Sequence, residues 1–185
     1  KNIATRLYEH VDKYVCKNVD MRGELTQPAL EKRPVRLNID PKQLSRSMVV
    51  PMGAWLGRTP KATYDNWEYR RLIYMGHLVE RQGVTTFILA VAELLKRGVT
   101  VTADIVGGGP LLDDLRSLAQ NLGIDKAITF HGFVDSHKDV EAILADATVA
   151  AAPYKHTPDN FTQFSDPGKI KAYMGASLPI VLTDV

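Results

Sequence analysis

A strand, a glycine-rich loop and a helix follow one another in the stretch VTVTADIVGGGPLLDDLRSLAQNL, residues 99–122. The stretch begins with a largely apolar run, which predicts a buried strand. Three glycines and a proline, residues 107–110, then interrupt the run. Leucines follow at spacings of four, three and four, at positions 111, 115, 118 and 122. This spacing predicts an amphipathic helix, which Gly123 would end.

The same strand–helix alternation continues on both sides of this stretch. Further strands are predicted at residues 72–75, 127–133, 148–153 and 178–182, and further helices at 84–97, 137–147 and 166–176. The strands are continuous apolar runs, which is typical of parallel strands that helices cover on both faces. The predicted fold class is therefore α/β, a Rossmann-like, doubly wound parallel sheet. In such a sheet, ligands bind at the carboxyl ends of the strands, near the point where the strand order reverses.

The first part of the chain follows a different pattern. Residues 3–18 predict a helix, whereas residues 21–47 show little periodicity and contain three prolines, which indicates a linker or a strap across another surface. Residues 1–71 hold 14 Lys and Arg against 8 Asp and Glu, and residues 72–185 hold 9 against 13. Because the predicted sheet region is acidic, we expect no nucleic-acid partner.

The composition also argues against disulfides, metal sites and membrane spans. A single cysteine, Cys16, excludes an internal disulfide and a cysteine-based metal cage. The histidines lack metal-ligand spacing, so we expect no metal site. No apolar run reaches the roughly 20 residues of a membrane span.

The loop 107–110 has residues suited to an anion. Gly108 and Gly109 let a ligand come close to the backbone, and the start of the following helix offers free N–H groups. A tight turn of small residues is the alternative interpretation. The glycine spacing differs from that of the dinucleotide-binding and phosphate-binding loops, so an NAD site is not supported.

Two other predicted strand–helix junctions carry candidate residues. The last helix begins with Asp166, Pro167, Gly168 and Lys169. Gly168 leaves the approach to the backbone open, and Lys169 adds positive charge where the helix dipole is already positive. The first loop carries His77, Arg81 and Gln82. His77 could donate to a phosphate, and Arg81 could reach one. A capped helix with solvated lysines, and an exposed His and Arg without a ligand, are the alternatives.

Six segments resemble, in the same order, motifs of the group 1 glycosyltransferases. They lie at residues 49–53, 72–84, 104–110, 128–134, 147–153 and 173–184. DIVGGGP resembles the family's I-V-G-x-G-P segment, and LIYMGHL followed by QGV resembles its Y-x-G-R-L and K-G opening. YMGA followed by PIVLTD resembles its E-a-M-A and P-V-V-a-T-D segment.

The resemblance implies a GT-B fold. Residues 48–185 would be its C-terminal, nucleotide-sugar-binding domain in truncated form, and residues 1–47 would be the tail of the N-terminal domain and the linker. Such enzymes transfer a sugar from a UDP- or GDP-linked donor to an acceptor with retention of configuration, without a metal ion or other cofactor. The acceptor site lies largely on the N-terminal domain, so this chain is expected to bind the donor but to transfer little by itself.

The resemblance also implies a set of donor-binding residues. The diphosphate would be bound by His77, Arg81, Gln82, Gly108, Gly109, Asp166, Gly168 and Lys169. The base would lie against Phe133 and Val134, and Lys155 would contact the sugar or a phosphate. The catalytic residues stay unassigned.

The sequence departs from the family's pattern at four positions. The phosphate-binding Arg and Lys of the first loop correspond to His77 and Gln82, and the family's paired glutamates correspond to Phe164 and Ala172. Lys169, in a helix start that resembles the variant S-P-x-K-L, would supply the missing phosphate charge. A variant transferase is therefore expected, with a non-catalytic nucleotide-binding domain and a nucleotide-sugar 2-epimerase as the alternatives.

A cytoplasmic location and a role in polysaccharide biosynthesis are further implications of the resemblance. The basic first part of the chain suits an anionic surface. Peripheral contact of the full-length protein with the inner membrane surface is therefore an additional hypothesis.

Overall fold

The computed structural model describes residues 2–54, 56–57, 59–62, 70–157 and 164–184. These residues belong to two compact units. One unit comprises Lys1–Gly53 and Phe161–Asp166, and the other comprises Ala54–Asn160 and Pro167–Val185. Within the described residues, no helix is both long and apolar enough to cross a membrane.

A parallel sheet forms the centre of the second unit. Its strands are β3 (Arg71–Met75), β4 (Thr102–Val106), β5 (Ile128–Gly132), β6 (Val149–Ala152) and β7 (Ile180–Leu182). They lie in the order β5-β4-β3-β6-β7, so the order reverses at β3. In the register of the central strands, Leu72 pairs with Ala103 on one side and with Val149 on the other.

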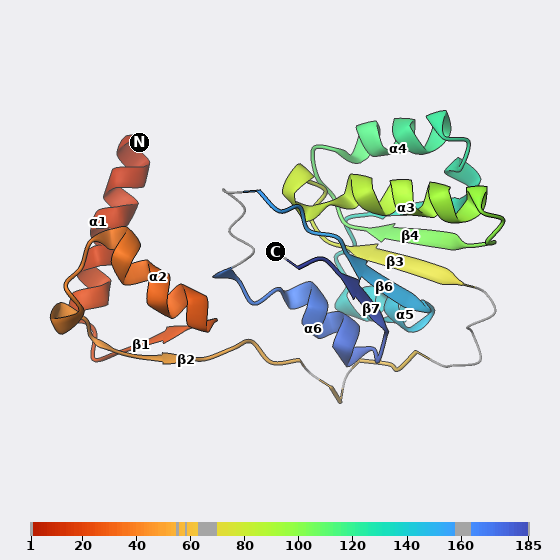
Figure 1. The fold of residues 1–185 in the computed structure, drawn as a ribbon. Coiled ribbons are helices and arrows are strands. Elements are labelled where there is room, and N and C mark those ends of the chain that lie inside the picture. Colours follow the sequence, from red (N-terminus) through yellow and green to blue (C-terminus); the bar gives the residue numbers. More distant parts are fainter. Residues whose placement is uncertain (1, 55, 58, 63–69, 158–163, 185) are drawn as a thin grey trace. The chain divides into compact units, whose positions relative to one another are not determined.

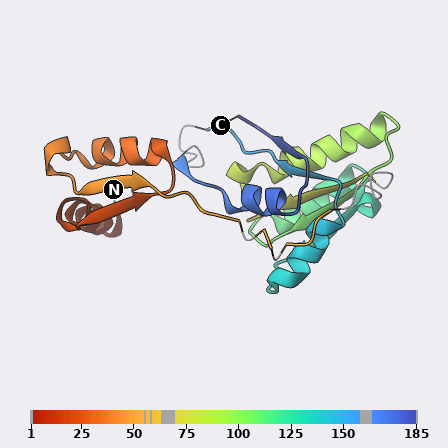
Figure 2. The same ribbon diagram turned by 90° about the horizontal axis from the view of Figure 1, so that it is seen from below.

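Helices cover both faces of this sheet. On one face lie α3 (Val84–Lys96) and α4 (Leu112–Asn121), and on the other lie α5 (His137–Ala145) and α6 (Gly168–Gly175), as Figure 1 shows. Figure 2 shows α3 and α5 on opposite sides of the strands. Short 3-10 turns, η3 (Glu80–Gln82) and η4 (Asp125–Ala127), precede α3 and β5.

The alternation of side chains along each strand divides the core into two clusters. Tyr74 points into the cluster that contains Phe87 of α3, whereas its neighbour Ile73 points into the cluster that contains Leu144 of α5. All of these side chains are almost completely buried. The predicted α/β fold, a Rossmann-like parallel sheet between two helical layers, is confirmed.

The first unit contains α1 (Ile3–Asn18), β1 (Met21–Glu24), α2 (Gln27–Leu37), the turn η1 (Pro41–Gln43) and β2 (Arg46–Val49). The predicted helix at residues 3–18 is confirmed, and β1 and β2 pair in parallel. The prediction that residues 21–47 lack regular structure is wrong. Thr26 caps α2 by accepting a hydrogen bond from Ala29 N, and Pro34 lies inside the helix rather than ending it.

Candidate functional site

Two glycine-containing loops meet at the carboxyl ends of β3 and β4, where the strand order reverses. Leu78 N donates to Gly108 O at 2.9 Å, and Leu111 N donates back to Leu78 O at 3.2 Å. Gly76 N donates to Val106 O at 2.9 Å. The loop after β3 and the loop after β4 are therefore held together by their backbones.

The close approach of these loops requires glycine at position 107. A Cβ atom on Gly107, whose φ is +140°, would lie 2.0 Å from Gly76 O. On Gly108, by contrast, a Cβ atom would lie 3.5 Å from the Cβ of Phe133, which is ordinary contact. The tight-turn interpretation therefore explains Gly107, whereas nothing in the loop packing requires glycine at Gly108.

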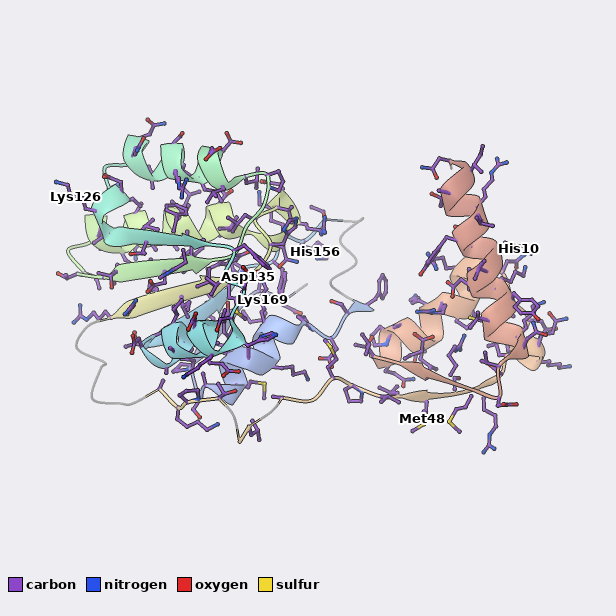
Figure 3. All side chains as sticks on the ribbon, turned by 180° about the vertical axis from the view of Figure 1, so that it is seen from behind. His10, Met48, Lys126, Asp135, His156 and Lys169 are labelled. Atoms are coloured by element: carbon purple, nitrogen blue, oxygen red, sulfur yellow. The ribbon has the colours of Figure 1, made fainter. Side chains whose placement is uncertain are left out.

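The ammonium group of Lys169 lies beside this pair of loops. Lys169 is in the first turn of α6, and Figure 3 labels it near the end of the β3 strand. Its Nζ donates a hydrogen bond to Gln82 Oε1 at 2.7 Å. The Nζ also lies 4.6 Å from the ring centroid of Tyr74 and 4.9 Å from that of Tyr154. A Cβ atom on Gly76 would lie only 2.7 Å from this Nζ, so glycine leaves the room that the ammonium fills.

Lys169 has no carboxylate partner within the described part of the chain. Burial lowers the pKa of Lys169 to about 8, because the charged form loses hydration. The faces of the two tyrosine rings offset part of that loss through cation–π attraction. The result is a partly buried ammonium that has a neutral hydrogen-bond partner and, among the described residues, no anion to compensate it.

His77 makes a local hydrogen bond in this structure. Its Nδ1 lies 2.9 Å from Gly108 O. Because a carbonyl oxygen only accepts, Nδ1 carries the proton. The Nε2 atom can then donate to a phosphate only when the ring is protonated at both nitrogens. The exposed His77 thus lies at the site, and its predicted phosphate contact stays a prediction.

The side chain of Lys155 pairs with Glu80, which connects the loop after β6 to the loop after β3. Lys155 N also donates to Arg81 O at 3.1 Å, while Arg81 itself is exposed. The structure therefore places Lys155 at the correct edge of the sheet. Its Nζ is engaged by a carboxylate rather than directed toward an open approach, so its predicted ligand contact requires that this ion pair give way.

The two predicted base-binding residues have different surroundings. Phe133 follows β5, is 77% exposed and lies against Gly108. Val134 packs against the second core cluster instead. Phe133 is therefore available to stack on a ligand, whereas the side chain of Val134 is structural.

The start of α6 also separates the predicted residues. Gly168 is exposed at the first position of the helix, which has no side-chain cap. Asp166 belongs to the first unit, where its Oδ2 accepts a hydrogen bond from Met52 N at 2.7 Å. The predicted contact of Asp166 with the diphosphate stays a prediction.

A family model of the group 1 glycosyl transferases matches residues 69–185, more than half of the chain. The chain belongs to the group 1 glycosyltransferases. One related glycosyltransferase, the putative colanic acid biosynthesis protein WcaL of Salmonella typhimurium, is 30% identical over 166 residues, which cover 88% of this chain and 40% of that protein. The GDP-mannose-dependent alpha-(1-6)-phosphatidylinositol monomannoside mannosyltransferase of Mycobacterium tuberculosis is 35% identical over 90 residues, 49% of this chain and 23% of that protein.

Solved structures of other proteins share the fold. The Anabaena protein Alr3699/HepE, in complex with UDP and glucose, matches 96% of this chain with a TM-score of 0.71 at 16% identity, and the chain covers 48% of it. WaaG, a glycosyltransferase of lipopolysaccharide biosynthesis, matches the whole chain with a TM-score of 0.70 at 18% identity, and the chain covers 50% of it. The chain spans half or less of the length of all these proteins. The named relatives are transferases, so the 2-epimerase and the non-catalytic alternatives are not favoured.

Two positions depart from the glycosyltransferase pattern without a visible replacement. Phe164, in the first unit, accepts a hydrogen bond from Thr26 Oγ1 through its backbone carbonyl, and Ala172 packs against the second core cluster. Neither side chain offers a carboxylate. No carboxylate at this pair of positions is therefore available to a ribose.

Sequence reasoning did not single out Tyr74 and Tyr154. Both are almost completely buried, and aromatic residues in apolar strands are ordinarily core residues. Burial raises the pKa of Tyr154 to about 12 and raises that of Tyr74 as well, so both rings stay neutral near pH 8. Their role at the site becomes visible only once Lys169 is placed between them.

Proposed function

We propose that this chain is the donor-binding part of a glycosyltransferase that takes its sugar from a UDP- or GDP-linked donor. The observation that carries the proposal is the uncompensated ammonium of Lys169 at the carboxyl ends of the strands. A nucleoside diphosphate would provide the negatively charged partner for this ammonium. The UDP-bound structure of Alr3699/HepE and the GDP-mannose-dependent relative support both donor classes.

Lys169 would act on the leaving group. When the bond between sugar and diphosphate breaks, negative charge grows on the diphosphate oxygens. A preorganised ammonium and nearby backbone N–H groups stabilise such charge without reorganising, and one donor of this kind is worth about 3–4 kcal/mol in other enzymes. Gly108, Gly109 and Gly168 would supply the N–H groups, and Arg81 and His77 would lie at the outer side of the diphosphate.

The proposal extends to the complete protein. The acceptor would be bound by the remainder of the protein. Transfer would proceed with retention of configuration. It would need no metal ion, because Lys169 would provide the positive charge. Phe133 would stack on the base. Peripheral contact with an anionic membrane surface at the cytoplasmic side is part of the same proposal.

Calorimetric titration of the 185-residue chain with UDP, GDP and inorganic pyrophosphate tests donor binding. We expect one nucleotide to bind, and Lys169→Met to raise its Kd roughly 10- to 100-fold, as the loss of about 1.5–3 kcal/mol from a charged hydrogen bond requires. Met keeps the apolar length between the two tyrosine rings, so the melting temperature is expected to be unchanged or higher.

Lys126→Met is the matched control for this titration. Lys126 is exposed in η4, before β5, at the opposite end of the strands, and Figure 3 labels both lysines. The control removes one positive charge without touching the site, so its affinity is expected to match that of the unchanged chain. Equal losses in both variants, or no binding of any probe, would contradict the proposal.

A further inference from the structure

The ends of the Gln82 and Lys169 side chains meet at one point of the site, although the two residues are 87 residues apart in the chain. Their side chains meet at 2.7 Å, with the amide oxygen of Gln82 as the acceptor. Gln82 ends η3 and Lys169 opens α6, so the contact joins two elements on opposite sides of the strand-order reversal. A cationic group on either side chain would therefore lie at almost the same place.

The neutrality of Gln82 has an electrostatic consequence. A lysine at position 82 would place two ammonium groups in contact, which repel each other strongly where water is excluded. A glutamate there would pair with Lys169 and cancel its charge. Only a neutral acceptor holds the ammonium and leaves its charge available to a ligand.

The neighbouring side chains restrict the ammonium in the same way. Tyr74 and Tyr154 contact it with neutral ring faces, and Gly76 offers no side chain at all. The described surroundings of Lys169 thus orient the ammonium without neutralising it. This distinguishes the arrangement from a structural ion pair, in which a carboxylate would satisfy the lysine.

We propose that Gln82 is a positioning residue that holds the Lys169 ammonium for the donor diphosphate and keeps the site cationic by being neutral. This inference rests on the proposed function, because it presumes that the diphosphate is the anion that Lys169 meets. Gln82 would then set the charge of the site, in addition to any contact that it makes with the ligand.

The substitution Gln82→Glu tests the inference with almost no change in shape. Calorimetry with inorganic pyrophosphate and with the nucleotide that the unchanged chain binds is expected to show at least a tenfold rise in Kd. The melting temperature is expected to stay the same or rise, because the introduced carboxylate pairs with Lys169 and replaces a neutral hydrogen bond by a charged one. A residue with a purely structural role would not separate affinity from stability in this way.

The charge swap provides the second variant. Gln82→Lys alone is expected to lower the melting temperature, and Lys169→Gln alone is expected to lose anion affinity. The double variant, Gln82→Lys with Lys169→Gln, restores one ammonium and one amide at the same contact, so its Kd for pyrophosphate is expected to return to within about threefold of the unchanged chain. Gln120→Glu, exposed on α4, is the control for added negative charge.

The outcomes separate the two proposals. If Gln82→Glu binds pyrophosphate as well as the unchanged chain while Lys169→Met does not, the role of Gln82 is wrong and the donor-binding function stands. If the double variant binds no better than the single variants, the shared cation position is overturned. If the unchanged chain binds none of the probes, the proposed function itself fails, and the inference with it.

Discussion

Lys169 is charged or neutral according to pH within an accessible range. Its pKa is lowered to about 8 by burial, whereas the ordinary value is 10.5. Only the ammonium form offers the charge that a diphosphate needs. We therefore expect the affinity for the bound nucleotide to be constant below about pH 8 and to fall progressively above it. Titrations at pH 7, 8, 9 and 10 measure this, with Lys169→Met as the reference for ionisation of the ligand.

The same ionisation has the opposite effect on the free energy of unfolding. Between pH 8 and 10.5, the folded protein has released the proton of Lys169 and the unfolded chain still holds it. The unfolded state then binds more protons, so this residue's contribution to stability rises with pH over that interval and is constant below it. Urea denaturation of the unchanged chain and of Lys169→Met at several pH values between 7 and 10.5 measures this contribution to the free energy of unfolding. A difference between them that does not change with pH would contradict the assignment.

The residues of the candidate site differ in how well their places can be predicted from the sequence. The places of Lys169 at a helix start and of Gly108 in a loop between strand and helix were predictable from the sequence, whereas their contacts with a ligand stay predictions. Tyr74 and Tyr154 were not predictable, because burial in an apolar strand looks the same whether a ring packs in the core or faces a cation. The pairing of Lys155 with Glu80 depends on the approach of two loops, which local sequence does not encode.

At the scale of elements, the packing of the loop after β4 requires glycine at positions 107 and 109 but not at Gly108. Gly107→Ala would bring a Cβ atom to 2.0 Å from Gly76 O at a φ of +140°. We expect a loss of at least about 1–3 kcal/mol in the free energy of unfolding, from backbone strain. Gly108→Ala is the adjacent control and is expected to change it by less than about 0.5 kcal/mol. Equal effects in urea denaturation would refute this account of the loop.

The helices and strands of the second unit were predictable because their patterns agree with their surroundings. The helix and strands of residues 21–47 were not predictable, because in this segment charged side chains are buried and apolar side chains are exposed. In β1 the buried side chains are Arg22 and Glu24, whereas Met21 is exposed. Arg33 of α2 reaches Glu24 at 3.0 Å and Asp12 at 2.9 Å. A strand whose inward face is charged gives no apolar signal, and its partners come from distant parts of the sequence.

For the whole molecule, each unit has its own buried core, and the chain's single cysteine reports on that of the first unit. Cys16 is completely buried in the first unit with Leu37 and Ile39. A thiol reagent can therefore reach it only when that unit opens. We expect Gly107→Ala, which strains the second unit, to leave the labelling rate of Cys16 unchanged. Acceleration of labelling in step with the loss of second-unit stability would show that the units open together.

The position of β3 in the sheet has a consequence for how the protein is made. Its partner β4 follows it closely in the chain, whereas β6 and α6 come much later. During synthesis, β3, β4 and β5 with their helices leave the ribosome before β6 and α6, and short-range pairing carries the smaller entropic cost. The two glycine loops can thus assemble on a nascent chain before Lys169 has been translated. The ammonium to which we assign the charge for the diphosphate is added after both loops, so a partly synthesised chain has the two glycine loops without this cation.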